Sequence, residues 1–229
     1  MEKKRIVVLT GAGISAESGL KTFRDGDGLW EEHRVADVAT PDAFRKNPDL
    51  VLRFYNMRRE ACLAAQPNAA HYGLVQLEEQ YEVRIITQNI DDLHERAGSA
   101  HVLHLHGVLT KMHSVRNDTI LYPYDQPIKL GDKAPDGGQF RPHVVWFGEA
   151  VPNIEPAFEL VNNWADIIVL IGSSLLVYPA AGLLKYAPTQ VPKYVIDKRI
   201  PEVDDLQNLV KIEMPATLGV SRLLDILLG

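Results

Sequence analysis

The sequence is poor in cysteine, with a single residue of this type, Cys62, among 229. One thiol can form neither an intrachain disulfide bond nor a four-cysteine zinc site. An excess of positive charge is also lacking, because 24 Lys and Arg face 30 Asp and Glu, a formal net charge of −6. A nucleic-acid-binding protein neutralises phosphates with clustered Lys and Arg, so this composition argues against specific nucleic-acid binding.

Targeting and membrane segments are lacking as well. The apolar run after the basic start of the chain covers only residues 6–9, which is too short for a signal-peptide core. Residues 167–184 carry no charge and meet a crude rule for a membrane span, but Gly172 and Pro179 interrupt them. Residues 167–171 are better explained as a short buried strand. We therefore expect a cytoplasmic protein without a membrane partner.

What the sequence does contain is a series of short apolar segments, each followed by a turn. These candidate strands cover residues 5–10, 83–87, 101–105, 167–171, 193–196 and 209–212. Candidate helices lie between most of them, at residues 42–65, 71–80, 91–97, 156–163, 179–187 and 218–228. Continuous apolar strands are typical of a parallel sheet covered on both faces. Their alternation with helices predicts an α/β fold with a Rossmann-like, doubly wound parallel sheet.

Two stretches interrupt this alternation. Residues 31–66 are mostly helical with charges spread along them, and residues 109–142 are rich in proline and glycine turns with few apolar runs. We interpret both as parts of a smaller helical and loop lobe inserted into the main sheet. The expected organisation is a single domain, residues 1–229, with a Rossmann-like core of about residues 1–30, 67–108 and 143–229 and a small lobe of about residues 31–66 and 109–142.

The turn after the first strand has a glycine pattern that suits phosphate binding. Residues 11–16, Gly-Ala-Gly-Ile-Ser-Ala, fit G-x-G-x-x-A, in which glycines let the backbone approach a pyrophosphate at a helix N-terminus. A plain strand-to-helix turn would have the same pattern. The acidic residue expected at the end of the second strand of a dinucleotide-binding fold is missing, which weakens a dehydrogenase interpretation.

Polar residues also follow the second and third candidate strands. Asn89 offers a donor and an acceptor, and Asp91 an anionic acceptor, although Asp91 could merely cap the next helix. His101, His104 and His106 are close in sequence, but no Cys or carboxylate joins them at zinc-ligand spacing. His106 is at the strand end and suits general-base chemistry, whereas we interpret His101 and His104 as structural.

Several motifs occur in a fixed order along the chain. They are Gly11-Ala12-Gly13-Ile14-Ser15 with Thr22-Phe23-Arg24, Thr87-Gln88-Asn89-Ile90-Asp91, His104-Leu105-His106-Gly107, Val144-Val145-Trp146-Phe147-Gly148-Glu149 and Gly172-Ser173-Ser174. This series resembles the sirtuin family of NAD-dependent protein lysine deacylases. The resemblance covers about residues 5–220 and leaves only residues 110–140 unlike the family. The Tyr55-x-x-Arg58 spacing is similar to that of bacterial desuccinylase and demalonylase members.

The resemblance implies that NAD is consumed as a co-substrate. The acyl oxygen of an acyl-lysine substrate would attack the nicotinamide ribose, nicotinamide would leave, and an alkylimidate would form. His106 would activate a ribose hydroxyl, and Asn89 would orient that hydroxyl or a water molecule. The products would be free lysine and O-acyl-ADP-ribose.

The resemblance also implies roles for other residues. Catalytic residues would be His106, Asn89, Asp91 and Arg24, with Asp91 and Ile90 holding the nicotinamide amide and Phe23 covering the reacting ribose. The NAD site would further include Gly11, Ala12, Gly13, Ser15, Ala16, Gln88, Gly172, Ser173, Ser174, Asp197 and Ala216. The acyl-lysine peptide would contact Tyr55, Arg58, Val144, Phe147, Gly148 and Glu149, with peptide pairing through the backbone of the last two.

The chain departs from the family in one respect. Most sirtuins carry two cysteine pairs in the small lobe, whereas residues 107–145 contain no cysteine and His113 is about where the first would be. We expect no zinc and a lobe held by local packing. Two alternatives to deacylation stay open, a mono-ADP-ribosyltransferase and a non-catalytic NAD or ADP-ribose sensor. The presence of His106 favours deacylation.

Overall fold

The computed structural model describes residues 2–21, 29–30, 33–177, 179–203 and 205–229. Its main element is a six-stranded sheet in which all neighbouring strands are parallel. The sheet order is β11 (Leu209–Glu213), β10 (Lys193–Asp197), β9 (Ile167–Ile171), β1 (Arg5–Thr10), β4 (Glu82–Thr87) and β5 (Val102–His104). When the six strands are numbered along the chain and read from the β5 edge, they follow the 3-2-1-4-5-6 order of a Rossmann fold. The predicted doubly wound α/β sheet is confirmed.

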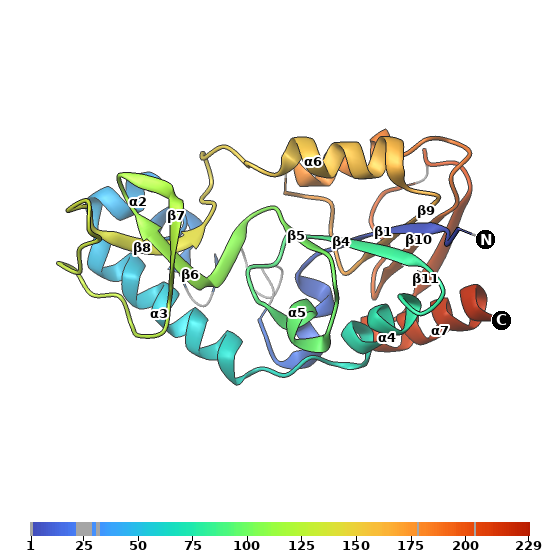
Figure 1. Ribbon diagram of the computed structural model, residues 1–229, viewed down its shortest axis with the longest axis horizontal. Coiled ribbons are helices and arrows are strands. Elements are labelled where there is room, and N and C mark those ends of the chain that lie inside the picture. The colour runs from blue at the N-terminus through green and yellow to red at the C-terminus, as the bar shows by residue number, and fades with distance from the viewer. Residues whose placement is uncertain (1, 22–28, 31–32, 178, 204) are drawn as a thin grey trace.

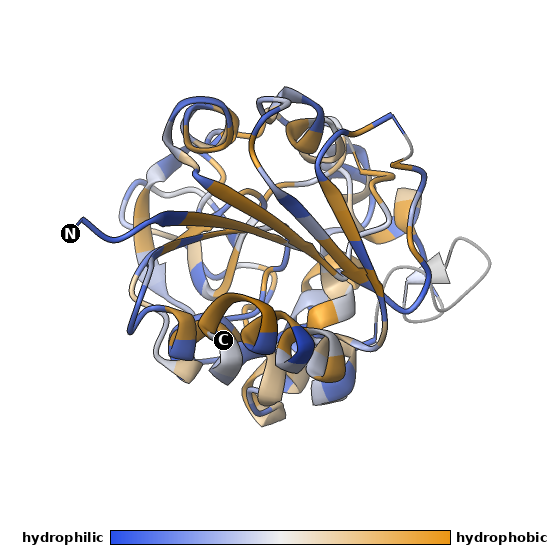
Figure 2. Ribbon diagram, turned by 90° about the vertical axis from the view of Figure 1, so that its right-hand side faces the viewer, coloured by the Kyte–Doolittle hydropathy of each residue, from blue (hydrophilic) through white to orange (hydrophobic). Residues whose placement is uncertain are grey.

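Helices cover both faces of this sheet, as the continuous apolar strands require (Figures 1 and 2). Ile6 and Val8 of β1 are buried against α4 (Ala69–Leu77) and α7 (Ala216–Leu228). The alternate residues Val7 and Leu9 pack on the other side, where α6 (Ile154–Glu159), η3 (Leu160–Trp164) and η4 (Ala180–Tyr186) lie. Both faces of the central strand are thus inside the protein.

Several helices differ from the sequence prediction. The turn after β1 forms two short 3-10 segments, η1 (Ala12–Ile14) and η2 (Ala16–Ser18), instead of the α-helix whose N-terminus was expected to face a pyrophosphate. The physical reason is that the Gly13 N–H donates to the Gly172 carbonyl at 2.8 Å, which ties this turn to the end of β9. The expected helix at residues 179–187 is the 3-10 segment η4, and the one at residues 91–97 is shortened to α5 (Leu93–Ala97).

The long helix expected at residues 42–65 is divided in two. The structure has α2 (Pro41–Lys46) and α3 (Pro48–Ala64), which follow the single-turn α1 (Val35–Val38). Asn47 ends α2 and caps α3, because its Oδ1 accepts the Leu50 N–H at 3.1 Å. Pro48 lacks an N–H group and suits the first position of a helix. Asn47 as the cap and Pro48 as the first helical residue therefore both favour a helix boundary at this point.

Residues 109–142 were expected to be a turn-rich part of a helical and loop lobe, which holds for residues 124–139 but misses the strands on either side of them. They contribute to a three-stranded antiparallel sheet in the order β7 (Asn117–Pro123), β6 (Gly107–Ser114) and β8 (Phe140–Val144). This sheet lies against α3, to the left of the main sheet in Figure 1. A two-stranded sheet of β2 (Leu29–Trp30) and β3 (His33–Arg34) is also present. The division into core and lobe as separate units stays a prediction.

The uncharged stretch at residues 167–184 is divided between β9, a loop and η4. Among the described residues, none of the helices combines the length and hydropathy needed to cross a bilayer.

Candidate active site

A cavity of about 410 Å³ opens beyond the carboxyl ends of the parallel strands. Its lining comes from the loops after β1, β4, β9 and β10, from α3, and from the segment after β8. The strand order reverses between β1 and β9, and open α/β sheets bind ligands in the crevice at such a reversal. The volume is within the range of small-molecule sites, so this cavity is the candidate active site.

Glycines let the backbone of the loop after β1 pack directly against the backbone of the loop after β9. A Cβ on Gly13 would lie 2.6 Å from Gly172 Cα, and one on Gly172 would lie 2.4 Å from Ile14 N. Gly172 also has a φ of +62°, which favours glycine. A side chain at either position would therefore push the two loops apart. This cradle fits a pyrophosphate, which needs close backbone approach.

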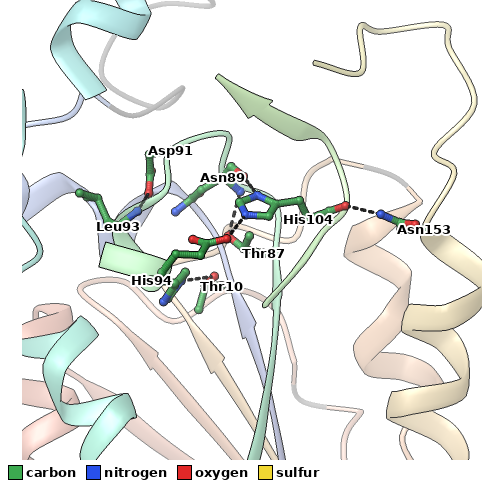
Figure 3. Close-up of polar contacts among 9 residues, drawn as sticks. Thr10, Thr87, Asn89, Asp91, Leu93, His94, His104 and Asn153 are labelled. Atoms are coloured by element: carbon green, nitrogen blue, oxygen red, sulfur yellow. Dashed lines mark hydrogen bonds and ion pairs between the residues drawn. The ribbon is translucent and has the colours of Figure 1, made fainter. Parts of the chain in front are cut away.

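Side-chain hydrogen bonds tie the loop after β4 to the loop after β1. Asn89 Nδ2 donates to Gly11 O and to Ser15 Oγ, each at 3.2 Å. Ser15 Oγ donates to Asp91 Oδ2 at 3.0 Å. The Leu93 N–H donates to Asp91 Oδ1 at 3.1 Å (Figure 3). Asp91 thus supports the start of α5 and also lines the cavity. Burial raises its pKa against the opposing effect of these two bonds.

His106 follows β5 and has one ring nitrogen held by the backbone. Its Nδ1 lies 3.0 Å from the Gln88 carbonyl oxygen, which can only accept, so Nδ1 carries the proton. Burial lowers the His106 pKa, which keeps the ring neutral near pH 7. The tautomer leaves Nε2 with a lone pair, and this is the arrangement that a general base needs. Gln88 is itself fixed, because its Nε2 donates to Ser173 Oγ at 3.1 Å.

The opposite end of the cavity lies at β10 and the start of α7. Asp197 ends β10, is 7% exposed, and accepts the Arg199 N–H at 3.0 Å through Oδ1. Ala216 is the first residue of α7 and lines the same region. A carboxylate at this position can accept hydroxyl protons from a ribose.

Aromatic side chains surround Tyr55 and Arg58 on α3, whose three-residue spacing places them on one helix face. Both are buried, and both line the cavity. The Tyr55 ring centroid lies 6.4 Å from that of Trp30 and 6.3 Å from that of Trp146. The Arg58 guanidinium carbon lies 5.0 Å from the Trp30 ring centroid. Burial raises the pKa of Tyr55, so its phenol stays protonated and can donate a hydrogen bond.

The segment after β8 is held by an ion pair. Arg141 donates to both carboxylate oxygens of Glu149, at 2.7 and 3.1 Å, and its guanidinium carbon lies 3.3 Å from the Trp146 ring centroid. The Glu149 N–H donates to Trp146 O at 3.0 Å, and the Phe147 N–H donates to Ala39 O at 3.0 Å. Peptide pairing was expected at Gly148 and Glu149. In this structure the Glu149 N–H already donates to Trp146, so a peptide would have to pair with the Glu149 carbonyl. Peptide pairing at Gly148 and Glu149 stays a prediction.

Most residues that the sequence predicted for the site line this one cavity. Phe23 and Arg24 lie outside the described residues, so their predicted roles stay untested. The lining includes Gly11, Ala12, Gly13, Ser15, Ala16, Tyr55, Arg58, Gln88, Asn89, Ile90, Asp91, His106, Val144, Phe147, Gly148, Glu149, Gly172, Ser173, Ser174, Asp197 and Ala216. The structure therefore brings residues from distant parts of the chain together, and their individual roles remain predictions.

Sequence reasoning missed other lining residues. Cys62 lies one helical turn after Arg58, so the α3 periodicity that paired Tyr55 with Arg58 could have found it. Lys198 directly follows Asp197 at a strand end, which was a usable signal. Trp30 has no local sequence signal, because it reaches the cavity only through the fold of the lobe. The remaining missed residues are Leu20, Lys21, Ala39, Val145, Trp146, Val151, Val177, Pro179, Ile196 and Arg199.

The histidines do not form a metal site within the described part of the chain, where no group of three His, Cys, Asp or Glu side chains is arranged to hold an ion. His113 and His143 form a pair instead, with their Nδ1 atoms 3.0 Å apart. His104 contacts Asn89 and Glu95, and His101 is exposed.

Comparisons with known proteins agree with the motif order. Residues 11–179 match the Sir2 family. The chain is 49% identical over 231 residues to an NAD-dependent protein deacylase of Bacteroides thetaiotaomicron, covering 98% of each chain. It is 50% identical over 206 residues to an NAD-dependent protein deacylase of Helicobacter pylori, covering 90% of each.

Solved structures with similar folds include a Sir2 homologue bound to NAD. That match has a TM-score of 0.87 and 36% identity, and covers 98% of this chain and 90% of the other. A Sir2 structure with a p53 peptide and NAD⁺ matches with a TM-score of 0.81 and 32% identity, covering 98% of this chain and 94% of the other.

Proposed function

The chain belongs to the Sir2 family and is an NAD-dependent protein deacylase, and on that premise we propose that it removes acetyl, succinyl and malonyl groups from lysine side chains. The observation that carries the proposal is the arrangement of the cavity. It combines a glycine cradle, a neutral histidine with a free lone pair on Nε2, and a buried arginine on the wall formed by α3.

NAD bound in the cavity would supply an electrophilic ribose carbon and a good leaving group, nicotinamide. The Gly11–Gly13 backbone would hold the pyrophosphate, and Asp197 would accept the adenosine ribose hydroxyls. Asn89 would orient the reacting ribose through its amide oxygen, because its Nδ2 already donates to Gly11 and Ser15. His106 Nε2 would take the proton of a ribose hydroxyl, and Nδ1 would stay bonded to the Gln88 carbonyl.

One assay separates this function from its alternatives. The protein is incubated with NAD and matched acetyl- and succinyl-lysine peptides, and nicotinamide, free-lysine peptide and the protein itself are measured by mass spectrometry. Deacylation produces nicotinamide and free lysine in equal amounts. A mono-ADP-ribosyltransferase instead produces a modified protein, and a sensor binds NAD without releasing nicotinamide.

The acyl preference follows from the buried guanidinium of Arg58. A guanidinium binds a carboxylate with two parallel hydrogen bonds. The terminal carboxylate of a succinyl or malonyl group would fit such a contact with Arg58, and the Tyr55 hydroxyl adds a further donor. Acetyl-lysine has no such carboxylate.

The preference is tested with Arg58→Met. Hydrogen bonds to charged groups contribute about 1.5–3 kcal/mol, so kcat/KM for the succinyl peptide should fall roughly 10- to 150-fold. The value for the acetyl peptide should change much less, and Tyr55→Phe should show a smaller effect of the same kind. Arg53→Met is the matched control, because Arg53 is on the same helix but exposed. Equal losses on both peptides would refute the acyl preference.

The other expected properties stay predictions. A cytoplasmic location is tested by cell fractionation, and the absence of specific nucleic-acid binding by a gel-shift assay across salt concentrations.

A further inference from the structure

His104, at the end of β5, has a hydrogen-bond acceptor at each ring nitrogen (Figure 3). Its Nδ1 lies 3.2 Å from the Asn89 carbonyl oxygen, and its Nε2 lies 2.7 Å from Glu95 Oε1. A carbonyl and a carboxylate can only accept, and a neutral imidazole has a single N–H. Both contacts are hydrogen bonds only if the ring carries two protons. The geometry therefore requires His104 to be an imidazolium.

The backbone of His104 is also fixed. Asn153 Nδ2 donates to the His104 carbonyl at 2.8 Å, which anchors this residue to the segment before α6. The His104 side chain is 14% exposed and that of Glu95 is 42% exposed, so the ring is mostly covered while the carboxylate stays in contact with solvent. The pair is thus a covered cation with a partly solvated anion.

The charged and titratable groups around the ring come from three elements. Glu95 and His94 belong to α5, Asp91 to the loop before it, and His143 to β8. Burial lowers the His104 pKa, but the hydrogen bond and charge of Glu95, together with smaller contributions from the Asn89 carbonyl and Asp91, outweigh burial, and the net pKa is raised. The two neighbouring histidines have lowered pKa values, to which burial contributes most and the His104 charge also contributes. The cluster therefore holds its one positive charge on His104.

The hydrogen bonds of Asn89 indicate the role of the His104 charge. Its N–H donates to Thr87 Oγ1 at 3.0 Å, its Nδ2 donates to two groups of the β1 loop, and its carbonyl accepts from His104. Of the polar groups of Asn89, the amide oxygen Oδ1 alone has no hydrogen bond to another described residue. It is the atom that the proposed function assigns to the reacting ribose.

We propose that His104 is a positioning residue, which as an imidazolium paired with Glu95 holds the Asn89 carbonyl and so fixes the amide oxygen of Asn89 for the ribose. Its own ring touches no substrate atom. When the imidazolium loses a proton at alkaline pH, the remaining N–H stays with the Glu95 carboxylate, the contact with the Asn89 carbonyl is lost, and the loop at residues 88–91 is free to turn. Glu95 sets the pH at which this happens. This inference rests on the proposed deacylase function.

The protonation state is tested without any activity measurement. In protein labelled with ¹⁵N-histidine, the two ring nitrogens of His104 are assigned by comparison with His104→Asn. At pH 7 we expect both to have shifts of protonated nitrogens, and in Glu95→Gln we expect the transition to a neutral ring to move to lower pH by about one unit. A neutral His104 ring in the wild type at pH 7 would overturn the proposal, whatever the enzyme does.

Two isosteric variants then separate the two contacts. The amide nitrogen of Asn mimics Nδ1 of histidine, and that of Gln mimics Nε2. His104→Asn should keep the bond to the Asn89 carbonyl and most of the turnover. His104→Gln keeps the bond to Glu95, and kcat should fall roughly 10- to 100-fold while KM for NAD changes much less. His101→Gln, on the same segment but exposed, is the control for a changed histidine.

The pH profile of kcat gives the remaining readout. In Glu95→Gln the alkaline limb should move to lower pH together with the ¹⁵N transition, whereas Glu79→Gln, an exposed carboxylate, should leave it unchanged. A profile that stays at its wild-type position, or equal turnover in His104→Asn and His104→Gln, would overturn the positioning role. If the wild type deacylates no peptide, the proposed function fails, and the ¹⁵N result still decides the charge of His104.

Discussion

The cavity-lining loops of the parallel-sheet core and the antiparallel lobe are held in place by different contacts. Around the cavity, uncharged hydrogen bonds join strand ends, as between the Asn89 amide and the Gly11 carbonyl or between the backbones of Gly13 and Gly172. In the lobe, arginines stack on aromatic rings, with Arg141 at 3.3 Å from the Trp146 centroid and Arg59 at 4.7 Å from that of Tyr124.

The difference follows from what each region has to provide. A ligand cradle needs bare backbone held at a fixed distance, and glycines with short hydrogen bonds supply it. The lobe has only a thin three-stranded sheet against α3 and needs large contact areas, which long arginine stems and aromatic rings supply. We therefore expect changes in the core to affect chemistry and changes in the lobe to affect stability.

We expect the largest effect in a comparison of two histidines, one from each region. His106 lines the cavity and His113 is paired with His143 in the lobe sheet. His106→Ala should lower kcat by about 10²- to 10⁴-fold, the usual loss for a general base, with little change in melting temperature. His113→Ala should lower the melting temperature and leave kcat nearly unchanged. Near-normal turnover in His106→Ala would remove the base assignment.

Two left-handed glycines provide the next comparison. Gly172 in the core and Gly131 in the lobe both have positive φ, but a Cβ on Gly172 would meet backbone at 2.4 Å, whereas one on Gly131 would meet nothing within 4 Å. Backbone strain alone costs about 1–2 kcal/mol, so this is the expected loss for Gly131→Ala. Gly172→Ala adds overpacking and should cost about 2–5 kcal/mol, together with loss of NAD binding.

Both stabilities are measured by urea unfolding, and NAD binding by calorimetry. Equal destabilisation by the two substitutions would show that the close approach of the β1 and β9 loops is not rigid.

The core was more predictable from the sequence than the lobe. The central strands β1 and β9 are continuous apolar runs, and the shorter apolar segments of the other four strands follow the same alternation with helices, so the pattern predicts the sheet. The lobe strand β7 is largely exposed, and Pro123 and Gly131 interrupt the stretch around it, so residues 109–142 have few apolar runs from which strands could be predicted. The break at Asn47 was visible as a cap followed by Pro48 but was outweighed by the long helical pattern.

For the site, the sequence predicted the motifs but not the contacts between them. Residue order indicated that Gly13, His106 and Gly172 follow strands, and parallel strand ends meet at one edge. The contacts between them depend on the distances between loops, which no local pattern encodes. For the same reason His104 was interpreted as merely structural, since its two acceptors come from Asn89 and Glu95, which meet only in the folded chain.

Acid should weaken both regions. Burial lowers the pKa of His71 in the core and of His113 in the lobe, each to about 4. The unfolded chain binds protons at an ordinary histidine pKa near 6.5, so each residue contributes its full stabilisation above that pH and loses it as the pH falls toward 4. Between pH 7 and pH 5 the expected loss is about 2 kcal/mol for each histidine.

The measurement is the free energy of urea unfolding at both pH values. His71→Gln and His113→Gln should each reduce the pH-dependent loss by that amount, because glutamine does not titrate. If either variant loses as much stability as the wild type between the two pH values, that histidine is not buried in its neutral form.

The smallest expected effect is that of a chelator. Cys62 is the only cysteine, it is 3% exposed, and burial raises its pKa to about 12, so it stays a thiol and is a poor metal ligand. Other contacts hold the lobe, among them Asn56, whose Nδ2 donates to the Ile128 carbonyl at 2.9 Å and whose Oδ1 accepts the Ile128 N–H at 2.9 Å. Excess chelator should therefore leave the melting temperature and the turnover unchanged.

Asn56→Ala is the positive control for this test, because it removes both bonds to Ile128 and should lower the melting temperature without chelator. Elemental analysis of the purified protein should find no stoichiometric zinc. One zinc per chain, or a lower melting temperature in chelator, would show that the lobe is a metal site after all. The His113 and His143 pair, whose Nδ1 atoms are 3.0 Å apart, would then be its first ligands to mutate, since bound metal contributes directly to folding free energy.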